Sequence, residues 1–442
     1  NSKLLFQSNR DFTIYADGSE NAELLGLTDL AAGTDLESSR PYNIEARAAG
    51  STVNFNLTGI DGEPGELYIA GAIVSEQQIN ITNDGASEQS SFEFDWSGLL
   101  ETTNGDINLN FGEATHLKGS LTAGNLDVNT TAAVNLQADD FLEISGEIQA
   151  TGSINIFAGL DAASTPIDSV TADKQNFRLN ATGRLLTTHD SGLEAINITA
   201  LNDIYLNGPT GVITDSGIEN YGNITILSES GTVYLTRERG WIETAGWVDI
   251  QGEFLHLEGA IRSNAMTSEA AEVYIASAGD LWLNGDVDSY GSVLIETAGN
   301  AEIRGGVDAG LVVKIDYSDF SQDTLENSGQ SLTIRTTGQL DIGGENEEGT
   351  AFGANLRASD HLLVEQVAGA DLFVNVASAL SSWDVDSLVE LVGSRIVVDG
   401  ALYAGRYNSE EWRGAASNVQ ITSDDRVVFG FAPDVAGSAL AT

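Results

Sequence analysis

Residues 279–299 read GDLWLNGDVDSYGSVLIETAG, and residues 300–310 continue with NAEIRGGVDAG. Apolar residues occupy every second position over short runs, and glycine, asparagine or aspartate interrupts each run. Alternation with a period of two is typical of β-strands that bury one face. The residues at the interruptions are typical of turns. This stretch therefore predicts a series of short strands joined by tight turns.

The same pattern recurs around this stretch, with three strands in each repeat. The first strand of successive repeats is predicted at 248–250, 273–275 and 293–295. The second is predicted at 255–257, 281–283 and 301–303. The third is centred on Ile242, Ile261, Val287 and Val307, so the step between repeats varies. Variable steps between fixed elements indicate loops of variable length.

Stacked repeats explain the pattern better than helices or a sandwich. The chain has 48 glycines and many β-branched residues, and it shows no long apolar pattern with helical spacing. A β-sandwich has longer antiparallel strands and needs no recurring register. We therefore predict an all-β parallel β-helix, or β-solenoid, with about twenty coils of three short strands.

The repeat is clearest over residues 105–349, which we predict to be the regular shaft. Residues 1–104 and 350–442 are less regular and predict N-terminal and C-terminal caps, because the end of a solenoid must protect an open sheet edge. The C-terminal part is alternatively a region where one chain meets the next. One helical turn is expected within DVDSLVELVG, residues 384–393.

Charge narrows the possible partners. The chain of 442 residues has 19 lysines and arginines against 66 aspartates and glutamates, a formal net charge of −47. Such a chain repels nucleic acid phosphates and anionic lipids, so neither is expected as a partner. No apolar run is long enough to cross a membrane. Diffuse Ca²⁺ binding over the acidic surface is expected rather than a discrete metal site, and no cofactor is expected.

Cysteine and histidine usage also argues against a metal site. The chain has no cysteine, so disulfides and thiolate ligands are excluded. The four histidines, His116, His189, His256 and His361, lie far apart in the sequence.

The motif Gly-x-Leu-x-Leu-x-Gly followed by Val-x-Ile resembles the repeats of filamentous haemagglutinin-like exoproteins. The resemblance covers about 240 residues of repeat style, and the Asn-Pro-Asn-Gly secretion motif of that family is absent. The resemblance implies a right-handed β-helical shaft at the cell surface or outside the cell, with an adhesive or structural role.

Ring-bearing residues recur at the outward position of the second strand. They are Tyr205, Tyr234, His256 and Trp282, followed by Glu302. Exposed rings stack on sugars or pack against proteins, so this column is the candidate ligand-binding face. Alternatively, the rings only stabilise one another as cross-strand pairs. Asn-x-Thr tripeptides also recur, as at 80–82, 197–199 and 223–225, and polar ladders on a solvated face explain them better than glycosylation.

These observations predict an extracellular or cell-surface structural and adhesive protein, which is a segment of a surface fibre or a large exoprotein. Self-association into fibres, end to end or side by side, is expected, and surface glycans are possible ligands. The alternative is a carbohydrate-binding or polysaccharide-cleaving β-helix. We expect no enzymatic activity, because cations are scarce and Gly-x-Ser-x-Gly is absent.

Overall fold

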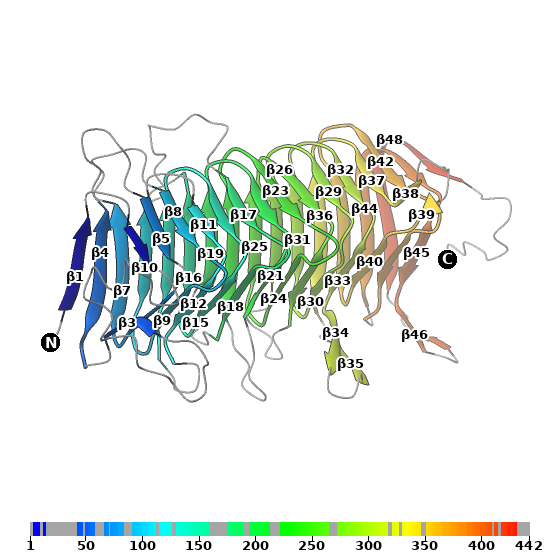
Figure 1. Cartoon of the computed structure of the whole chain (residues 1–442). Helices are drawn as coiled ribbons and strands as arrows, with labels where there is room; N and C mark the ends of the chain where they lie inside the picture. Colours follow the sequence, from blue (N-terminus) through cyan, green and yellow to red (C-terminus); the bar gives the residue numbers. More distant parts are fainter. Residues whose placement is uncertain are drawn as a thin grey trace. The chain divides into compact units, whose positions relative to one another are not determined.

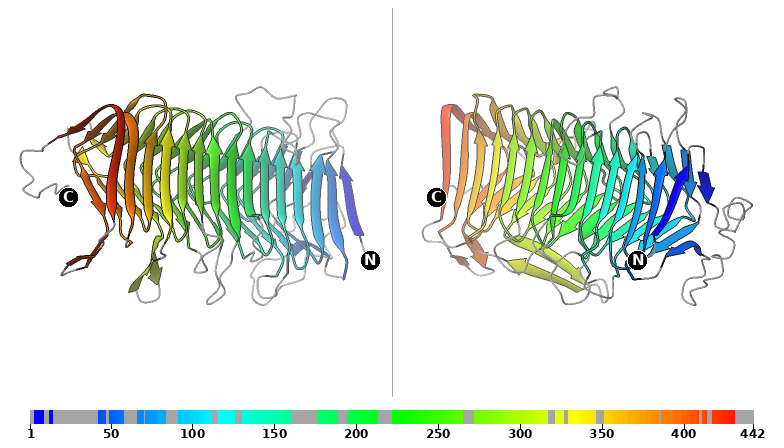
Figure 2. Two further views of the ribbon diagram at one scale, coloured as in Figure 1. Left: turned by 180° about the vertical axis from the view of Figure 1, so that it is seen from behind. Right: turned by 90° about the vertical axis from the view of Figure 1, so that its left-hand side faces the viewer.

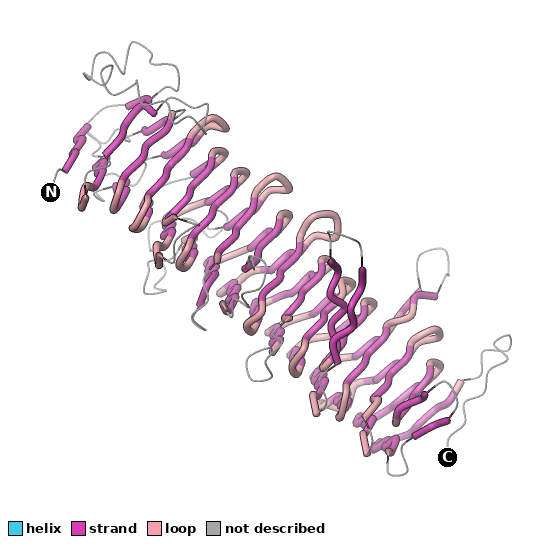
Figure 3. The backbone as a smooth tube through the Cα atoms, turned by 90° about the horizontal axis from the view of Figure 1, so that it is seen from below, coloured by secondary structure: helices cyan, strands magenta, loops and turns pink. Residues whose placement is uncertain are grey.

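The structure is a computed structural model that describes residues 3–8, 12–14, 42–46, 49–57, 66–69, 71–83, 91–111, 115–125, 130–159, 176–188, 194–212, 222–264, 272–316, 321–326, 329–345, 351–384, 386–408, 411–413 and 417–430. These residues form strands and turns and no helix (Figure 3). Consistently, the described part of the chain has no helix that could span a membrane. The chain divides into two compact units, Asn1–Gly231 and Thr232–Thr442.

In the first unit, each coil contributes one strand to each of three stacks, which we call stacks 1, 2 and 3. Stack 1 consists of β1 (Lys3–Ser8), β4 (Thr52–Leu57), β7 (Gln78–Asn83), β10 (Ile107–Phe111), β13 (Val134–Ala138), β16 (Ile154–Ala158), β19 (Glu194–Ala200) and β22 (Asn223–Ser228). Stack 2 consists of β2 (Phe12–Ile14), β5 (Glu66–Ile69), β8 (Ser91–Phe94), β11 (Thr115–Leu117), β14 (Leu142–Ile144), β17 (Phe177–Leu179) and β20 (Ile204–Leu206). Stack 3 consists of β3 (Tyr42–Ala46), β6 (Ala72–Ser75), β9 (Leu99–Thr102), β12 (Ser120–Ala123), β15 (Glu147–Ala150), β18 (Arg184–Thr187) and β21 (Pro209–Val212).

The second unit has the same three stacks. Stack 1 consists of β25 (Val248–Gly252), β28 (Val273–Ser277), β31 (Val293–Thr297), β36 (Ser331–Thr336) and β41 (His361–Gln366). Stack 2 consists of β23 (Thr232–Leu235), β26 (Phe254–Leu257), β29 (Leu281–Leu283), β32 (Ala301–Ile303), β37 (Leu340–Ile342) and β42 (Asp371–Val374). Stack 3 consists of β24 (Trp241–Thr244), β27 (Ala260–Ser263), β30 (Val287–Ser289), β33 (Gly306–Ala309), β40 (Asn355–Ala358), β43 (Ala379–Ser382) and β45 (Ala401–Ala404). The long strands β44 (Leu388–Val398) and β48 (Asn418–Phe429) extend over stacks 1 and 2.

Within each unit, neighbouring strands of a stack are parallel and in register (Figures 1 and 2). In stack 3 of the second unit, Ile242, Ile261, Val287 and Val307 are successive partners, and each side chain is fully buried. Alternation explains this arrangement, because every second side chain of a strand points to the same side. The predicted all-β parallel β-helix is confirmed, and so is the predicted pairing of these strands.

One repeated tripeptide is out of register by two residues. The Asn-Ile-Thr tripeptides suggest that Asn197 and Asn223 are equivalent, but β19 pairs Asn197 with Thr225. A shift of two residues keeps every side chain on the same face of the sheet. Sequence pattern alone therefore cannot distinguish the two registers.

Coils differ in length because loops are inserted between strands. Partners in adjacent coils are 20 residues apart at Asn135 and Asn155, and 49 residues apart at Asp308 and Arg357. The longer step contains two antiparallel hairpins, β34 (Leu311–Asp316) with β35 (Ser321–Glu326), and β38 (Gly344–Glu345) with β39 (Ala351–Phe352). A third hairpin pairs β46 (Arg406–Asn408) with β47 (Glu411–Arg413). Because of such insertions, third strands number 14 in the described residues, fewer than the twenty or so coils expected.

Two further sequence expectations concern the terminal regions. The helical turn expected within 384–393 is absent from residues 388–393, which belong to β44, where Val389 and Leu391 are buried. Leu388 and Leu391 are three residues apart, as in a helix, whereas Val389 and Leu391 are two apart, as in a strand, so the pattern is ambiguous over such a short run. In-register pairing extends into β6 and β9 near the N-terminus and into β43 and β45 near the C-terminus. The division into cap, shaft and cap stays a prediction.

Glycines form a corner after the strands of stack 2 in the second unit. Gly259, Gly285 and Gly305 each follow a strand by two residues. A Cβ atom at Gly305 would lie 1.9 Å from the carbonyl oxygen of Gly285, and one at Gly285 would lie 1.9 Å from that of Gly259. The backbones of successive coils approach too closely here for any side chain. This explains why glycine follows these three strands of stack 2.

Candidate functional site

Three of the four ring-bearing residues that the sequence singles out are stacked on the second unit. Register pairs Tyr234 of β23 with His256 of β26, and His256 with Trp282 of β29. Each ring lies between two buried aliphatic side chains of its own strand, as in Leu281–Trp282–Leu283, so it must point outward. The row continues with Glu302 of β32 and Asp341 of β37. We call these five residues the central row.

The rings of the central row contact one another. The centroids of Tyr234 and His256 are 5.9 Å apart with an interplanar angle of 35°, and those of His256 and Trp282 are 4.4 Å apart with an angle of 53°. His256 Nε2 lies 3.4 Å from Glu258 Oε1. Trp282 keeps 36% of its surface exposed. The stacked rings therefore support one another, and part of the Trp282 indole remains exposed to solvent.

A cation supports Trp282 from the neighbouring coil. The Arg304 guanidinium carbon lies 5.5 Å from the Trp282 ring centroid and 5.8 Å from that of Phe352, and Arg304 Nε donates to Glu302 Oε1 at 2.6 Å. Phe352 belongs to the β38–β39 hairpin, which the sequence reasoning did not anticipate. A cation between two rings contributes about 0.5–1 kcal/mol per exposed contact. Arg304 thus fixes the orientation of the indole.

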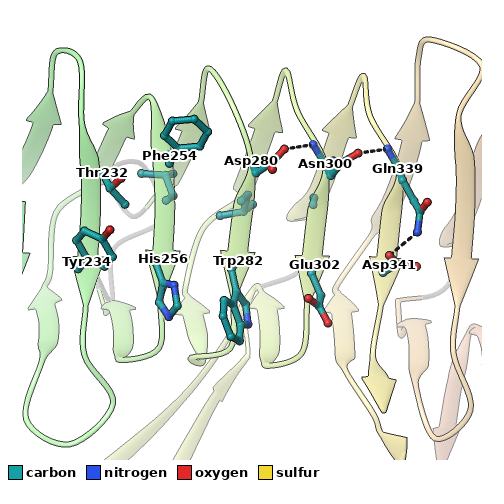
Figure 4. A pocket seen from close by; sticks show the side chains of 13 residues that line it. Thr232, Tyr234, Phe254, His256, Asp280, Trp282, Asn300, Glu302, Gln339 and Asp341 are labelled. Atoms are coloured by element: carbon teal, nitrogen blue, oxygen red, sulfur yellow. Dashed lines mark hydrogen bonds between the residues drawn. The ribbon is translucent and has the colours of Figure 1, made fainter. Parts of the chain in front are cut away.

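A second row of side chains lies beside the central row, two residues earlier on each strand. We call it the border row; it consists of Thr232, Phe254, Asp280, Asn300 and Gln339 (Figure 4). The backbone N–H of Asn300 donates to Asp280 Oδ1 at 2.7 Å, and that of Gln339 donates to Asn300 Oδ1 at 2.9 Å. Gln339 Nε2 also donates to Asp341 Oδ2 at 2.7 Å, which links the two rows.

The two rows line an open groove of about 570 Å³ on the outer face of stack 2. Its floor is the strands themselves, whose intervening residues Leu255, Leu281 and Ala301 face inward and are buried. Phe254 of the border row is 43% exposed and lines the groove together with Trp282 of the central row. The groove runs across five strands, so it extends from coil to coil rather than along one strand (Figure 4).

The groove carries negative charge, and its lining residues include no lysine or arginine, while Arg304 pairs with Glu302 beside it. Its carboxylates are Asp280, Glu302 and Asp341. Burial raises the pKa of Asp341, the hydrogen bond from Gln339 opposes this, and the nearby Glu302 and Asp371 carboxylates raise it further. The chemistry available is ring stacking and hydrogen bonding, in a field that repels anions.

The fourth predicted residue, Tyr205, lies in the first unit in different surroundings. On stack 2 its partner is Arg178, whose guanidinium carbon is 5.1 Å from the Tyr205 ring centroid. Its hydroxyl donates to Asp203 Oδ2 at 3.1 Å. Glu143 precedes Arg178 in the same row, and His116 Nδ1 lies 3.2 Å from Glu143 Oε2. Within its own unit, Tyr205 therefore ends a row of charged residues.

Stack 1 of the first unit carries an asparagine ladder that sequence reasoning did not identify as such. Each amide donates to the preceding one, at 2.7 Å from Asn80 to Asn54, from Asn108 to Asn80 and from Asn135 to Asn108, and at 2.8 Å from Asn155 to Asn135. Recurring tripeptides such as Ile-Asn-Ile and Val-Asn-Leu are the signal that could have revealed it. Asn80 lies in this ladder, which accounts for one of the Asn-x-Thr tripeptides.

Stack 3 of the second unit carries a row of charges along a second groove. Register aligns Arg262, Asp288, Asp308 and Arg357. Arg262 Nε lies 3.5 Å from Asp288 Oδ2, and Arg357 Nε donates to Asp308 Oδ1 at 2.6 Å. Burial raises the pKa of Asp288 to about 6, with the neighbouring Asp308 carboxylate adding to the effect and Arg262 opposing it.

Metal ligands do not gather in the part of the chain that the structure describes. Its residues contain no group of three or more histidine, aspartate or glutamate side chains placed to hold an ion. Described histidines pair with glutamates instead, and His361 Nε2 lies 3.3 Å from Glu390 Oε2.

Stacked parallel strands around an apolar interior, with an outward aromatic groove, define the chain as an all-β parallel β-helix protein. It is similar to a hemolysin of Proteus mirabilis, with 22% identity over an alignment of 380 positions that covers 72% of this chain and 23% of the hemolysin. The chain thus spans less than a quarter of the length of that relative. No family model and no solved structure matches the sequence.

Proposed function

We propose that the chain is a structural and adhesive β-helix segment of a large bacterial exoprotein, acting at the cell surface or outside the cell. The similarity to a hemolysin supports a secreted or surface protein, and the hemolysin is much longer than this chain. The repeat style, which resembles filamentous haemagglutinin-like exoproteins, agrees with this. The net charge of −47 suits a protein that must stay soluble outside the cell.

The observation that carries the adhesive role is the exposed aromatic groove of the second unit. Trp282 and Phe254 are large rings on a face where alternation otherwise places polar side chains, and they are 36% and 43% exposed. Exposed apolar groups that gather on one face mark interaction sites.

The structural role follows from the stacks. Buried aliphatic columns and continuous backbone ladders connect each coil to the next, as in the pairing of β41 with β44 and of β44 with β48. We include self-association in the proposal. On β48, Val427 and Phe429 pair with the buried Ile396 and Val398 of β44, yet they are 37% and 57% exposed. A further strand that pairs with β48, such as one from a second copy, would cover them.

Adhesion is tested by coating fluorescent beads with the full chain and counting beads retained on epithelial and bacterial cell layers under flow. We expect the beads to be retained above the level of albumin-coated beads. Surface exposure is tested by protease shaving of intact cells that produce the parent protein, followed by immunoblotting. Retention equal to albumin, or a protein protected in intact cells, would contradict the proposal.

Self-association is tested separately, by sedimentation velocity and electron microscopy of the purified chain at physiological salt. We expect assemblies whose abundance falls when Val427 and Phe429 are replaced by lysine. A wild-type chain that stays monomeric at every concentration would remove self-association from the proposal and leave adhesion standing.

A further inference from the structure

We propose that the groove on stack 2 of the second unit binds a linear, uncharged glycan that lies across the strands. This inference rests on the proposed adhesive function and assigns its ligand. Trp282 and Phe254 are the stacking platforms, and the polar side chains of the border row are the hydrogen-bonding groups.

The shape of the groove requires an extended ligand. The border and central rows run parallel across β23, β26, β29, β32 and β37, and adjacent strands are about 4.8 Å apart. A ligand that contacts both ends of the groove must therefore cross four strand spacings. A compact molecule would contact only one or two coils, whereas a linear polymer contacts all of them.

The aromatic platforms are oriented before any ligand arrives. His256 packs on one side of Trp282 at 4.4 Å between centroids, and Arg304 lies on the next coil, 5.5 Å from the same ring. Across the groove, Gly279 gives the Phe254 ring its space, because a Cβ there would lie 2.6 Å from Phe254 Cε1. Rigid rings lose little conformational entropy on binding, which favours affinity for a weakly hydrophobic partner such as a sugar face.

The polar groups of the border row are also oriented. Because Asn300 Oδ1 accepts from the backbone of Gln339, the Asn300 Nδ2 group faces away from that contact as a donor. Asp280 Oδ1 is held in the same way by the backbone of Asn300, which leaves Oδ2 as an acceptor. A row that alternates donors and acceptors beside flat rings suits a molecule with an apolar face and a hydroxyl-bearing edge. Pyranose sugars have this form.

Charge selects among glycans. Asp280, Glu302 and Asp341 line the groove, and the whole chain carries a net charge of −47. Uronate, sialylated and sulfated polymers would be repelled. A peptide is disfavoured for another reason. The floor is the face of a sheet whose backbone groups are paired between strands, as in Leu281–Ala301, so a peptide finds no open edge for strand addition.

The test uses the full chain and oligosaccharides of two to six units from cellulose, xylan, laminarin, chitin and galactan, with polygalacturonate, sialyllactose and heparin fragments as charged probes. Binding is measured by isothermal titration and by tryptophan fluorescence. We expect one neutral series to bind, with affinity rising as the chain lengthens. Trp282→Ala should weaken that binding at least tenfold, and Trp282→Phe should restore part of it.

Trp96→Ala is the matched control, because Trp96 is 57% exposed and lies in the other unit. This variant should bind like the wild type, and circular dichroism melts should show that all variants are folded. Preference for an anionic glycan or a cationic peptide, no glycan binding at all, or equal binding by the Trp282→Ala variant would overturn the inference. If beads coated with that variant still adhere to cells, the adhesive function stands and only this ligand assignment fails.

Discussion

Gly305 and Gly306 are adjacent in the sequence but have different reasons to be glycine. A Cβ at Gly305 would lie 1.9 Å from a backbone oxygen of the preceding coil, whereas one at Gly306 would first meet the Asp286 carboxylate at 3.2 Å. Backbone cannot move aside without disturbing the ladder, but a side chain can. The corner glycine is therefore required by the approach of two coils, and its neighbour is not.

We predict that Gly305→Ala destabilises the second unit by about 3 kcal/mol, at the upper end of overpacking costs, while Gly306→Ala changes stability by less than about 1 kcal/mol. Urea denaturation followed by circular dichroism measures both. Equal effects of the two substitutions would contradict the requirement for glycine at residue 305.

The asparagine ladder gives a second prediction. Asn108 donates to Asn80 and accepts from Asn135, so Asn108→Ala breaks two hydrogen bonds and removes the partners of the Asn80 amide oxygen and the Asn135 amide N–H. We expect a loss of about 1–3 kcal/mol. Asn110→Ala is the control, since Asn110 lies on the same face of β10 and has no part in the ladder. Urea titration of both variants compares them, and a larger loss for Asn110→Ala would contradict the prediction.

The stacked carboxylates of stack 3 predict a pH dependence. The pKa of Asp288 is raised to about 6 in the folded chain, from an ordinary value of 3.8. The folded state therefore binds the proton more tightly, and this contribution to stability is full below pH 4 and is lost as the pH rises through about 6. Asp288→Asn should remove this contribution to the pH dependence and make the second unit more stable at pH 7.5 by about 1–3 kcal/mol.

Thermal melts at half-unit intervals from pH 4 to pH 8 measure this effect. Glu253→Gln, which removes an exposed carboxylate of the same unit, should keep the wild-type profile. An Asp288→Asn variant that is less stable than the wild type at pH 7.5 would mean that the ion pair with Arg262 outweighs the burial of charge.

Residue patterns predicted the rings of the candidate site better than their surroundings. Tyr234, His256 and Trp282 could be aligned because a period of two places them on one face and the repeat places them in adjacent coils. Phe352 could not, because it reaches Arg304 from an inserted hairpin that follows no repeat. The pairing of Asp288 with Asp308 follows from the repeat, because each aspartate comes directly after an equivalent valine, but the effect on the pKa depends on burial, which sequence alone does not give.

At the scale of elements, the hairpin β34–β35 projects from the second unit without taking part in its stacks (Figure 1). On either side of it, Val307 and Leu356 pair in register, as do Val293 and Leu332. The strands of the coil therefore pair in register without any contribution from the inserted hairpin. The length of such an insertion adds only a slowly growing entropy of loop closure.

We predict that residues 310–330 can be replaced by Tyr-Gly-Ser, the turn found at 290–292 between the equivalent strands β30 and β31. The shortened chain should keep its circular dichroism spectrum, and its melting temperature should change by only a few degrees, about 4 °C or less. The control replaces 310–330 with a Gly-Ser linker of equal length. Loss of cooperative unfolding in both variants would show that the hairpin is part of the folded unit.

Elements were predictable where the repeat is strict. The strands around residues 242–307 fall where alternation and glycine corners place them. The prediction of a helical turn within 384–393 was wrong from residue 388. Over so short a run, the spacing of Leu388 and Leu391 suggests a helix while that of Val389 and Leu391 suggests a strand. Tertiary pairing of β44 with β41 decided the outcome there.

For the whole molecule, the dominant physical term outside the core is charge. With a net charge of −47, the acidic side chains repel one another. Salt shortens the range of that repulsion from about 30 Å at 0.01 M to about 8 Å at 0.15 M. We predict that the melting temperature rises between 10 mM and 500 mM NaCl. Calorimetric scans measure this shift, and a melting temperature that falls with salt would show that ion pairs such as Arg395–Asp371 dominate instead.

Calcium provides the complementary measurement. At matched ionic strength, CaCl₂ should raise the melting temperature further than NaCl and without saturating at one equivalent, as diffuse binding requires. A sharp step at one equivalent would indicate a discrete site and would contradict the expectation of diffuse binding.

The 49-residue step between Asp308 and Arg357 has a practical meaning. Neighbouring coils tolerate inserted hairpins at two corners of one turn while their pairing continues unchanged. Such a corner is a natural graft point, where an epitope or a small folded cargo with closely spaced ends can be displayed. Insertions at these corners do not disturb the stacked strands, so related proteins are expected to differ most in the loops and hairpins inserted there.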